Sequence, residues 1–384
     1  MLLRETTPAP IGIFVHHQGR GHAERAAALA NALAPRRQVV LFSAREDMFP
    51  LLAEGVCVRQ IPSLFEGKGS GTPFLDSQPT PDVYHCAPVG WPTITKAVAI
   101  LTNWFAEARP ALFITDVSAE LGQLARIASV PHIAVLQHGD RTDPGHTASY
   151  DGAVGLLAPF DERLEQPGRP AEYRHKTHYC GGIGVEIEHR DSIEARKALG
   201  LPLDKYITLV LAGGGGQGTP TAPLTLGARA DHNGHWVVIG KTFSEWHETP
   251  PTNLDLRGWV DDVPSYLAAA DRVVSSCGNT TVHQVLATGK PWIAIPEWRY
   301  FAEQEAKAAA LGAAGVCATA MTWPSDATRW NLLWAAADQV DCALGPSFVD
   351  GKAAEGAANW VHEVAKQCEP APTDTNKTRL EIVA

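Results

Sequence analysis

The sequence predicts an α/β protein of two domains, each built on a parallel sheet, that face each other across a cleft. The chain has 384 residues, more than the roughly 250–300 over which a single core usually grows. Apolar runs typical of strands alternate with helical patterns in both halves, which favours parallel sheets. Hydrophobic residues make up 45% of the chain, so each half can form a core of its own.

The first half begins with an apolar run, a glycine-bearing turn and a helix rich in alanine and leucine. His22 stands where the turn becomes helix. Such strand–turn–helix units build the ligand sites of open α/β sheets. Residues 63–91 are rich in glycine, proline, serine and aspartate, which predicts a long functional loop. We expect strands at 11–15, 38–43, 111–115, 132–136 and 153–158, and helices at 26–33, 47–54, 93–108 and 119–128.

The second half repeats this alternation after residues 161–182, where two prolines and adjacent glycines predict the connection between the domains. We expect a first domain at 1–165, a linker at 166–182, a second domain at 183–367 and a polar, disordered tail at 368–384. The expected strands are 206–211, 235–239, 256–260, 272–275 and 292–295, and the expected helices are 263–270, 281–287 and 351–367.

Composition excludes several classes of partner. A formal charge of −10 argues against nucleic acid or anionic lipid as a general partner. The first residues lack the apolar core of a signal peptide, and no run approaches the roughly 20 apolar residues of a membrane helix. Seven scattered cysteines without a C-x-x-C pair indicate reduced thiols in a cytoplasmic protein, with neither a disulfide framework nor a zinc site. The histidines form no metal-binding motif either.

Two loops in the second half could bind an anion. Residues 213–218 follow a strand, and their five glycines leave backbone N–H groups free to face a phosphate. The Gly-Lys-Ser/Thr of a P-loop is absent, which excludes that type of phosphate site. The alternative interpretation of this glycine run is a flexible loop without a ligand. Residues 276–281 lie between a strand and a helix, where amides and hydroxyls can hold a phosphate. Ordinary N-capping by Thr280 or Thr281 is the alternative there.

Ordered motifs in residues 258–304 resemble inverting nucleotide-sugar glycosyltransferases. They are Gly258-Trp-Val-Asp-Asp, Cys277-Gly-Asn-Thr-Thr with Gln284, Gly289-Lys-Pro, and Glu303-Gln304. The first half joins the resemblance through the Gly-x-Gly-His loop that ends at His22. The sequence looks most like the MurG-type UDP-N-acetylglucosamine transferases of peptidoglycan synthesis and related natural-product UDP-glycosyltransferases. This resemblance implies the GT-B fold, in which two Rossmann-like domains face each other across a cleft.

The resemblance also implies a donor site in the second domain, where the two loops would bracket the diphosphate of a UDP-sugar. Ser276 stands where plant-type relatives have a histidine, and Gln284 stands where the family usually has a ribose-binding glutamate. These two differences leave the identity of the nucleotide undecided. Trp259 and the segment 240–243 are candidates to border the base, although Trp259 and Phe243 also suit a core position. The implied donor-binding residues are Gly214, Gly215, Gly216, Gln217, Ser276, Gly278, Asn279, Thr280, Thr281, Gln284, Glu303 and Gln304.

The same resemblance assigns catalysis to the first domain. His22 matches the general base that deprotonates an acceptor hydroxyl, and Asp116 matches the aspartate that orients this histidine. His17 is the alternative base. The pair Asp261-Asp262 is better explained by helix capping than by metal binding, so we expect neither a metal nor a cofactor beyond the donor substrate.

The acceptor is not specified by any motif. It could be a small molecule, a natural product or a lipid-linked acceptor, contacted by the loops 63–91 and 137–147, which include His138, Asp140 and Arg141. Trp104 and Phe105 could contribute to this specificity or to a peripheral membrane contact. Two other functions remain open: an epimerase of the same fold, such as a UDP-N-acetylglucosamine 2-epimerase, and a non-catalytic nucleotide-sugar-binding protein.

Overall fold

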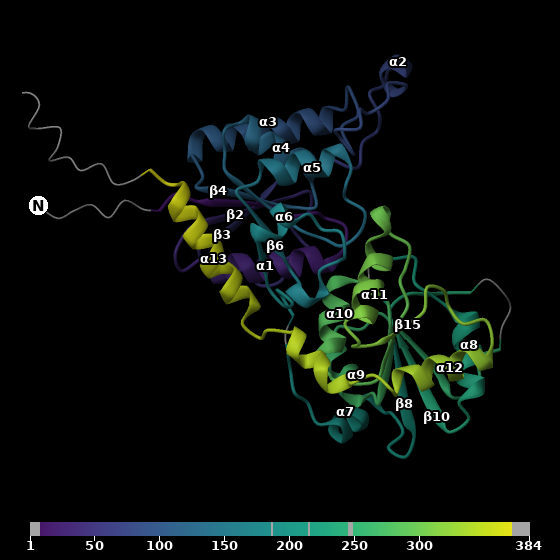
Figure 1. Ribbon diagram of the computed structural model, residues 1–384. Coiled ribbons are helices and arrows are strands. Elements are labelled where there is room, and N and C mark those ends of the chain that lie inside the picture. The colour runs from purple at the N-terminus through teal and green to yellow at the C-terminus, as the bar shows by residue number, and fades with distance from the viewer. Residues whose placement is uncertain (1–7, 186, 214–215, 245–248, 371–384) are drawn as a thin grey trace, which may run out of the picture.

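The computed structural model describes residues 8–185, 187–213, 216–244 and 249–370, and confirms an α/β protein with two parallel sheets. Figure 1 shows the two sheets in separate bodies, each with helices on its faces. Most of the predicted tail, 371–384, lies outside the described residues. The first sheet has the order β3-β2-β1-β4-β5-β6-β7, and its strands are β1 (Ile11–Phe14), β2 (Val39–Ser43), β3 (Val56–Gln60), β4 (Leu112–Asp116), β5 (His132–Val135), β6 (Gly155–Ala158) and β7 (Thr177–Tyr179).

Helices cover both faces of this first sheet, which is why its central strands read as continuous apolar runs. Every residue of β1, β2 and β4 is buried. The segments that cover the sheet or extend its loops are α1 (Arg20–Leu33), α2 (Pro73–Asp76), α3 (Pro92–Ala108), α4 (Ala119–Ile127), α5 (Pro144–Gly152), η1 (Glu162–Leu164) and α6 (Ala171–His175).

The second sheet has the order β12-β10-β8-β13-β14-β15, and a small two-stranded sheet joins β9 to β11. All its pairings are parallel, and β8 and β13 lie at its centre. Its strands are β8 (Tyr206–Leu211), β9 (Thr219–Pro220), β10 (Gly234–Ile239), β11 (Thr242–Phe243), β12 (Leu254–Gly258), β13 (Arg272–Ser275), β14 (Trp292–Ala294) and β15 (Ala318–Thr319); its helices are α7 (Ser192–Leu199), α8 (Thr221–Ala230), α9 (Val263–Ala269), α10 (Asn279–Leu286), η2 (Tyr300–Ala302), α11 (Glu303–Ala313), α12 (Ala327–Ala337) and η3 (Cys342–Phe348).

The last helix, α13 (Ala353–Cys368), packs on the first domain instead of the second. Figure 1 shows it, in yellow, along the first domain beside α1. Its buried residues Ala357, Val361 and Ala365 share one hydrophobic core with Ile11 of β1. The predicted second domain of 183–367 therefore extends too far. The prediction failed because small alanine side chains indicate close packing of two helices but not which sheet the helix covers.

Three further expectations differ from the structure. Residues 47–54 form no helix and lead instead into β3, an edge strand whose alternating exposure hides it from an apolar pattern. The predicted linker 166–182 contains β7, which pairs with β6, so the first domain extends to Tyr179. Trp104 and Phe105 are buried in a core cluster under α3, which excludes them from acceptor and membrane contacts.

Buried histidines predict that the fold is sensitive to acid. Burial is the main cause that lowers the pKa of His16, His132 and His283 from 6.5 to about 4. Between these values the unfolded chain binds more protons than the folded one, so the free energy of unfolding falls as pH drops from 6.5 towards 4. The expected slope is up to about 1.4 kcal/mol per pH unit for each histidine. Urea unfolding followed from pH 7 to pH 4.5 measures this, and a constant free energy over that range would contradict it.

Candidate active site

His22 and Asp116 lie together at the carboxyl edge of the first sheet. His22 is in the first turn of α1, and its Nδ1 is 2.9 Å from Oδ2 of Asp116, the last residue of β4. The next residue, Val117, has a φ of 67°, a left-handed conformation that is strained for a β-branched side chain. This turn ends the strand at Asp116. The structure thus brings together the two residues that the sequence proposes as base and orienting acid.

Arg25 completes this cluster and was not predicted from the sequence. Its Nη2 donates to Oδ1 of Asp116 at 2.6 Å and lies 3.0 Å from Nδ1 of His22. Burial raises the pKa of Asp116, but Arg25 and His22 outweigh burial and hold that pKa well below its ordinary range. Asp116 is therefore ionised. In the tautomer of His22 that carries its hydrogen on Nδ1, this hydrogen goes to Oδ2 of Asp116, Arg25 bonds to Asp116 alone, and Nε2 is left to receive a proton. The sequence did contain a signal for this contact: His22 and Arg25 are three residues apart on one helix, and such residues lie on the same face.

His17, the alternative base, has other partners. Its Nε2 lies 3.0 Å from Oε1 of Glu66, and its ring stacks on His16. His16 in turn packs on Phe65, with ring centroids 4.5 Å apart, and lies 5.6 Å from His22. Of the two candidate histidines, only His22 is hydrogen-bonded to Asp116.

The first turn of α1 contacts the start of α10 in the second domain. A Cβ atom at Gly21 would lie 2.7 Å from Oγ1 of Thr280, so a larger residue at this position would require Thr280 to move. Gly278 is the N-cap residue of α10, and no side chain of the described residues caps this helix. The alternative of capping by Thr280 or Thr281 is therefore wrong. The helix start remains available to an anion.

The two predicted donor loops are neighbours, as far as they are described. The backbone N–H of Gly213 is 3.5 Å from Oγ of Ser276, which is itself buried. Gly216 lies against Glu297, while Gln217 is exposed. Gly214 and Gly215 lie outside the described residues, so the glycine loop stays a prediction at those positions.

Glu303 and Gln304 have different surroundings. Gln304 is buried, and its Oε1 accepts hydrogen bonds from the backbone N–H groups of Cys277 and Glu297, both at 2.9 Å. Gln304 thus fixes the loops after β13 and β14 to each other. Oε2 of Glu303 accepts a hydrogen bond from Nη2 of Arg141 in the first domain at 3.1 Å.

The remaining second-domain candidates are partly corrected. Trp259 is 57% exposed, so the core interpretation is wrong for it. Phe243 is half-buried in β11, and Gln284 is half-buried on α10. Asp262 caps α9 by accepting from the backbone N–H of Ser265, as the capping interpretation predicts.

The first-domain loop after β5 faces the second domain. His138 is completely buried, with Nε2 2.6 Å from the carbonyl oxygen of Leu164, so it cannot contact an acceptor. The backbone N–H of Asp140 donates to the carbonyl of Phe301 at 2.7 Å. The bonds from Asp140 to Phe301 and from Arg141 to Glu303 join the first domain to η2 and the start of α11.

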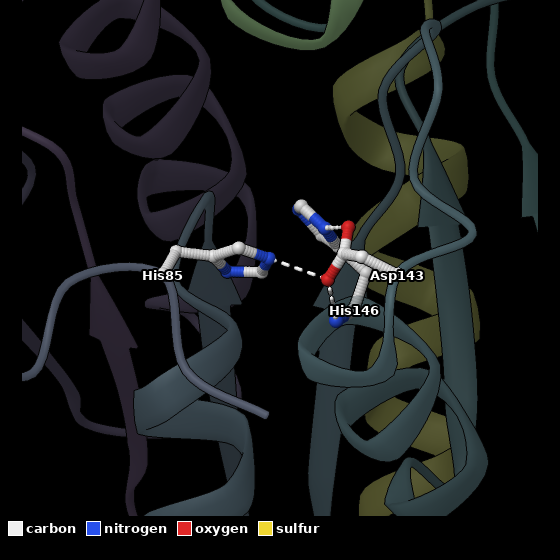
Figure 2. Close-up of side chains that lie close together, drawn as sticks. All are labelled: His85, Asp143 and His146. Atoms are coloured by element: carbon white, nitrogen blue, oxygen red, sulfur yellow. Dashed lines mark hydrogen bonds and ion pairs between the residues drawn. The ribbon is translucent and has the colours of Figure 1, made fainter. Parts of the chain in front are cut away.

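A cluster of His85, Asp143 and His146 has the composition of a metal site (Figure 2). In the described part of the chain these ligand atoms lie within 4.8 Å of one another. Asp143 contacts Nε2 of His85 at 2.5 Å and Nδ1 of His146 at 2.6 Å. Arg141, which can only donate, lies 2.9 Å from Nε2 of His146. Nδ1 of His146 must therefore carry the hydrogen that Asp143 accepts, and it is not free to bind a metal ion.

The first domain also has an apolar cavity of about 200 Å³, which Tyr84 and Cys86, the chain neighbours of His85, help to line. Its lining includes Phe65, Tyr84 and Cys86 from the long loop, with Ile94 from α3 and Leu124 from α4. Phe65 also packs on His16, which contacts His22. The cavity is thus separated from His22 by one phenyl ring and one imidazole.

Two observations concern the environment of the chain. All seven cysteines, which fall within the described residues, are free thiols. Over the described part of the chain, every helix is too short or too polar to cross a membrane.

Comparisons with known sequences agree with this architecture. Residues 240–321 match the Glycosyltransferase family 28 C-terminal domain. One relative is the UDP-N-acetylglucosamine--N-acetylmuramyl-(pentapeptide) pyrophosphoryl-undecaprenol N-acetylglucosamine transferase of Caldicellulosiruptor saccharolyticus, 29% identical over 44% of this chain and 50% of its own. Another is an uncharacterized glycosyltransferase of Methanosarcina mazei, 22% identical over 78% of this chain and 83% of its own. The chain spans about half the length of the first relative.

Solved structures share the whole fold. The glycotransferase of kitacinnamycin has a TM-score of 0.64, with 16% identity over 95% of this chain and 100% of its own. MurG of Acinetobacter baumannii has a TM-score of 0.59, with 14% identity over 93% and 100%. The spinosyn rhamnosyltransferase SpnG, complexed with thymidine diphosphate, has a TM-score of 0.57, with 15% identity over 93% and 96%. The predicted resemblance is thus confirmed: the chain has the GT-B fold, and the proteins it resembles are glycosyltransferases.

Proposed function

We propose that the protein is an inverting glycosyltransferase that moves a sugar from a UDP-sugar to an acceptor hydroxyl, with His22 as general base. The observation that carries this proposal is the hydrogen bond between His22 and Asp116 at the carboxyl edge of one sheet. The start of α10 lies directly opposite, because Gly21 contacts Thr280. A base and an anion site therefore meet across the two domains.

The reaction follows from this arrangement. Nε2 of His22 removes the proton of the acceptor hydroxyl as its oxygen forms a bond to the anomeric carbon. The bond from that carbon to the diphosphate breaks, and its electron pair leaves with UDP. Asp116, ionised beside Arg25, stabilises the imidazolium that forms. Because the base and the diphosphate lie on opposite domains, attack comes from the face opposite the leaving group and inverts the anomeric centre.

The donor would bind with its diphosphate at the start of α10. Free N–H groups and the helix dipole favour negative charge there, so charge stabilisation requires no metal ion. Gln284 on α10 would bind the ribose and Glu303 the sugar. UDP is proposed because the relative from C. saccharolyticus is named for a UDP-sugar donor, whereas SpnG was solved with thymidine diphosphate.

The acceptor would carry an apolar group. The cavity lined by Phe65, Tyr84 and Leu124 supplies apolar surface in the domain of His22, and burial of such surface contributes roughly 25 cal/mol per Å². An acceptor that places its apolar part there would have to extend past Phe65 and His16 to present a hydroxyl to Nε2. The free thiols support a reducing compartment, and we propose a cytoplasmic location on that ground.

The test begins with nucleotide binding. UDP at a hundred times its Kd should stabilise the protein by about 2.7 kcal/mol, which a thermal shift detects. A panel of UDP-sugars is then incubated with apolar hydroxyl compounds, and UDP release is followed. Release that requires both donor and acceptor supports the proposal. Interconversion of sugars without an acceptor would identify an epimerase, and a shift with GDP or TDP but not UDP would contradict the donor.

A further inference from the structure

Lys307 is a buried positive charge without an acidic partner. It lies on α11 and is 3% exposed, and its Nζ donates to Oδ1 of Asn279 at 2.8 Å. No ion pair within 4.0 Å involves Lys307 in the described part of the chain. Glu303, one turn earlier on the same helix, bonds to Arg141 instead. Burying a charge without a counter-ion raises the free energy of the folded protein, so an anion that binds nearby is stabilised.

The position of Lys307 shows where such an anion would bind. Its partner Asn279 is the first residue of α10, and the adjoining helix start has no side-chain cap among the described residues. Asn279 also donates from Nδ2 to the carbonyl of Pro159 in the first domain, at 3.0 Å. Lys307 therefore acts on the same helix start that contacts Gly21. Ser276, which precedes this helix start, is buried and carries no charge.

We propose that Lys307 supplies the positive charge of the donor diphosphate site, and that it does so from behind the helix start by holding Asn279. This inference rests on the proposed function. Lys307 is a positioning residue, because Asn279 lies between it and the site. When the bond from the anomeric carbon to the diphosphate breaks, the ammonium stabilises the additional negative charge on the departing UDP.

The electrostatic surroundings give this role a measurable signature. Burial lowers the pKa of Lys307 to about 8 in the unliganded protein. A bound diphosphate favours the charged form and raises that pKa. Above pH 8, UDP binding therefore takes up a proton, and the Kd for UDP increases with pH. The charged and titratable groups around Lys307 are Glu303 on its own helix, Cys277, Arg25, Arg141, His138 and His283.

Calorimetry of the full chain with UDP and with uridine tests the proposal. Lys307→Met removes the charge and keeps most of the side-chain volume. This variant should bind UDP about tenfold or more weakly, because an interaction of about 1.4 kcal/mol is lost. Its affinity for uridine, which has no diphosphate, should be unchanged. Proton uptake on UDP binding, measured above pH 8 in two buffers of different ionisation enthalpy, should disappear. Lys307→Arg should retain most of the UDP affinity.

Lys290→Met is the matched control. Lys290 also has a pKa lowered to about 8 by burial, but its Nζ bonds to the carbonyls of Leu267, Ala268 and Ala270 at the end of α9. This variant should bind UDP like the unaltered protein.

Several results would overturn the assignment. Unchanged UDP affinity in a folded Lys307→Met variant would leave Lys307 as a structural support for Asn279. Equal loss of UDP and uridine would show a collapsed loop instead of a missing charge. If the variant does not fold, UDP binding by the unaltered protein without proton uptake above pH 8 contradicts the proposal. Failure of the unaltered protein to bind UDP would instead contradict the proposed function itself.

Discussion

Replacement of His22 by alanine should lower the kcat of UDP-sugar turnover by about 10²–10⁴-fold, the usual contribution of a general base. The binding of UDP should remain within about twofold, because the imidazole contacts Asp116 and Arg25 and the nucleotide site lies in the other domain. Steady-state release of UDP measures the first effect and calorimetry measures the second.

His17→Ala is the matched control for this experiment. His17 lies in the same loop region but bonds to Glu66, and it should retain most of the activity. Comparable losses in both variants would point to a general disturbance of the loop. Loss of UDP binding in His22→Ala would place His22 in the donor site and contradict its role as base.

The second large effect is expected for Asp116→Ala, through stability. The change leaves the guanidinium of Arg25 buried without its counter-ion, since Asp116 and Arg25 are 2% and 6% exposed. Breaking a buried pair in this way costs about 3–5 kcal/mol. Urea denaturation measures the loss in the free energy of unfolding.

The double variant Asp116→Ala with Arg25→Met separates stability from chemistry. With both charges removed, most of the lost stability should return, because an apolar side chain tolerates the buried position. Turnover should stay low, since His22 still lacks the carboxylate that orients it. A single variant that loses less than about 1 kcal/mol would contradict the buried ion pair.

The sequence predicts the sheets well and the edges of the domains poorly. Buried strands such as β4 are continuous apolar runs because helices cover both faces. The edge strand β3 and the short β7 lack that signal, since half-exposed strands mix polar and apolar residues. The alanine-rich face of α13 specifies close packing but not its partner, so the helix was assigned to the wrong domain.

The site shows the same division. His22, Asp116 and Ser276 lie at strand ends, the usual place for ligand sites in open α/β sheets, and the resemblance to glycosyltransferases supplied their roles. Arg25 and Lys307 could not be assigned, because each lies inside a helix and is defined by what it meets in space. The cluster at His85 was missed for a related reason: His85 and His146 come from distant segments that only the fold brings together.

The packing of α13 on the first domain means that, over the described residues, the chain passes between the domains twice. The outward crossing near Gly181 and the return near Asp350 touch, since the backbone N–H of Asp350 donates to the carbonyl of Gly181 at 2.9 Å. The second domain is thus an insertion whose two ends leave the first domain side by side. A chimera that exchanges the second domain must therefore be joined at both points.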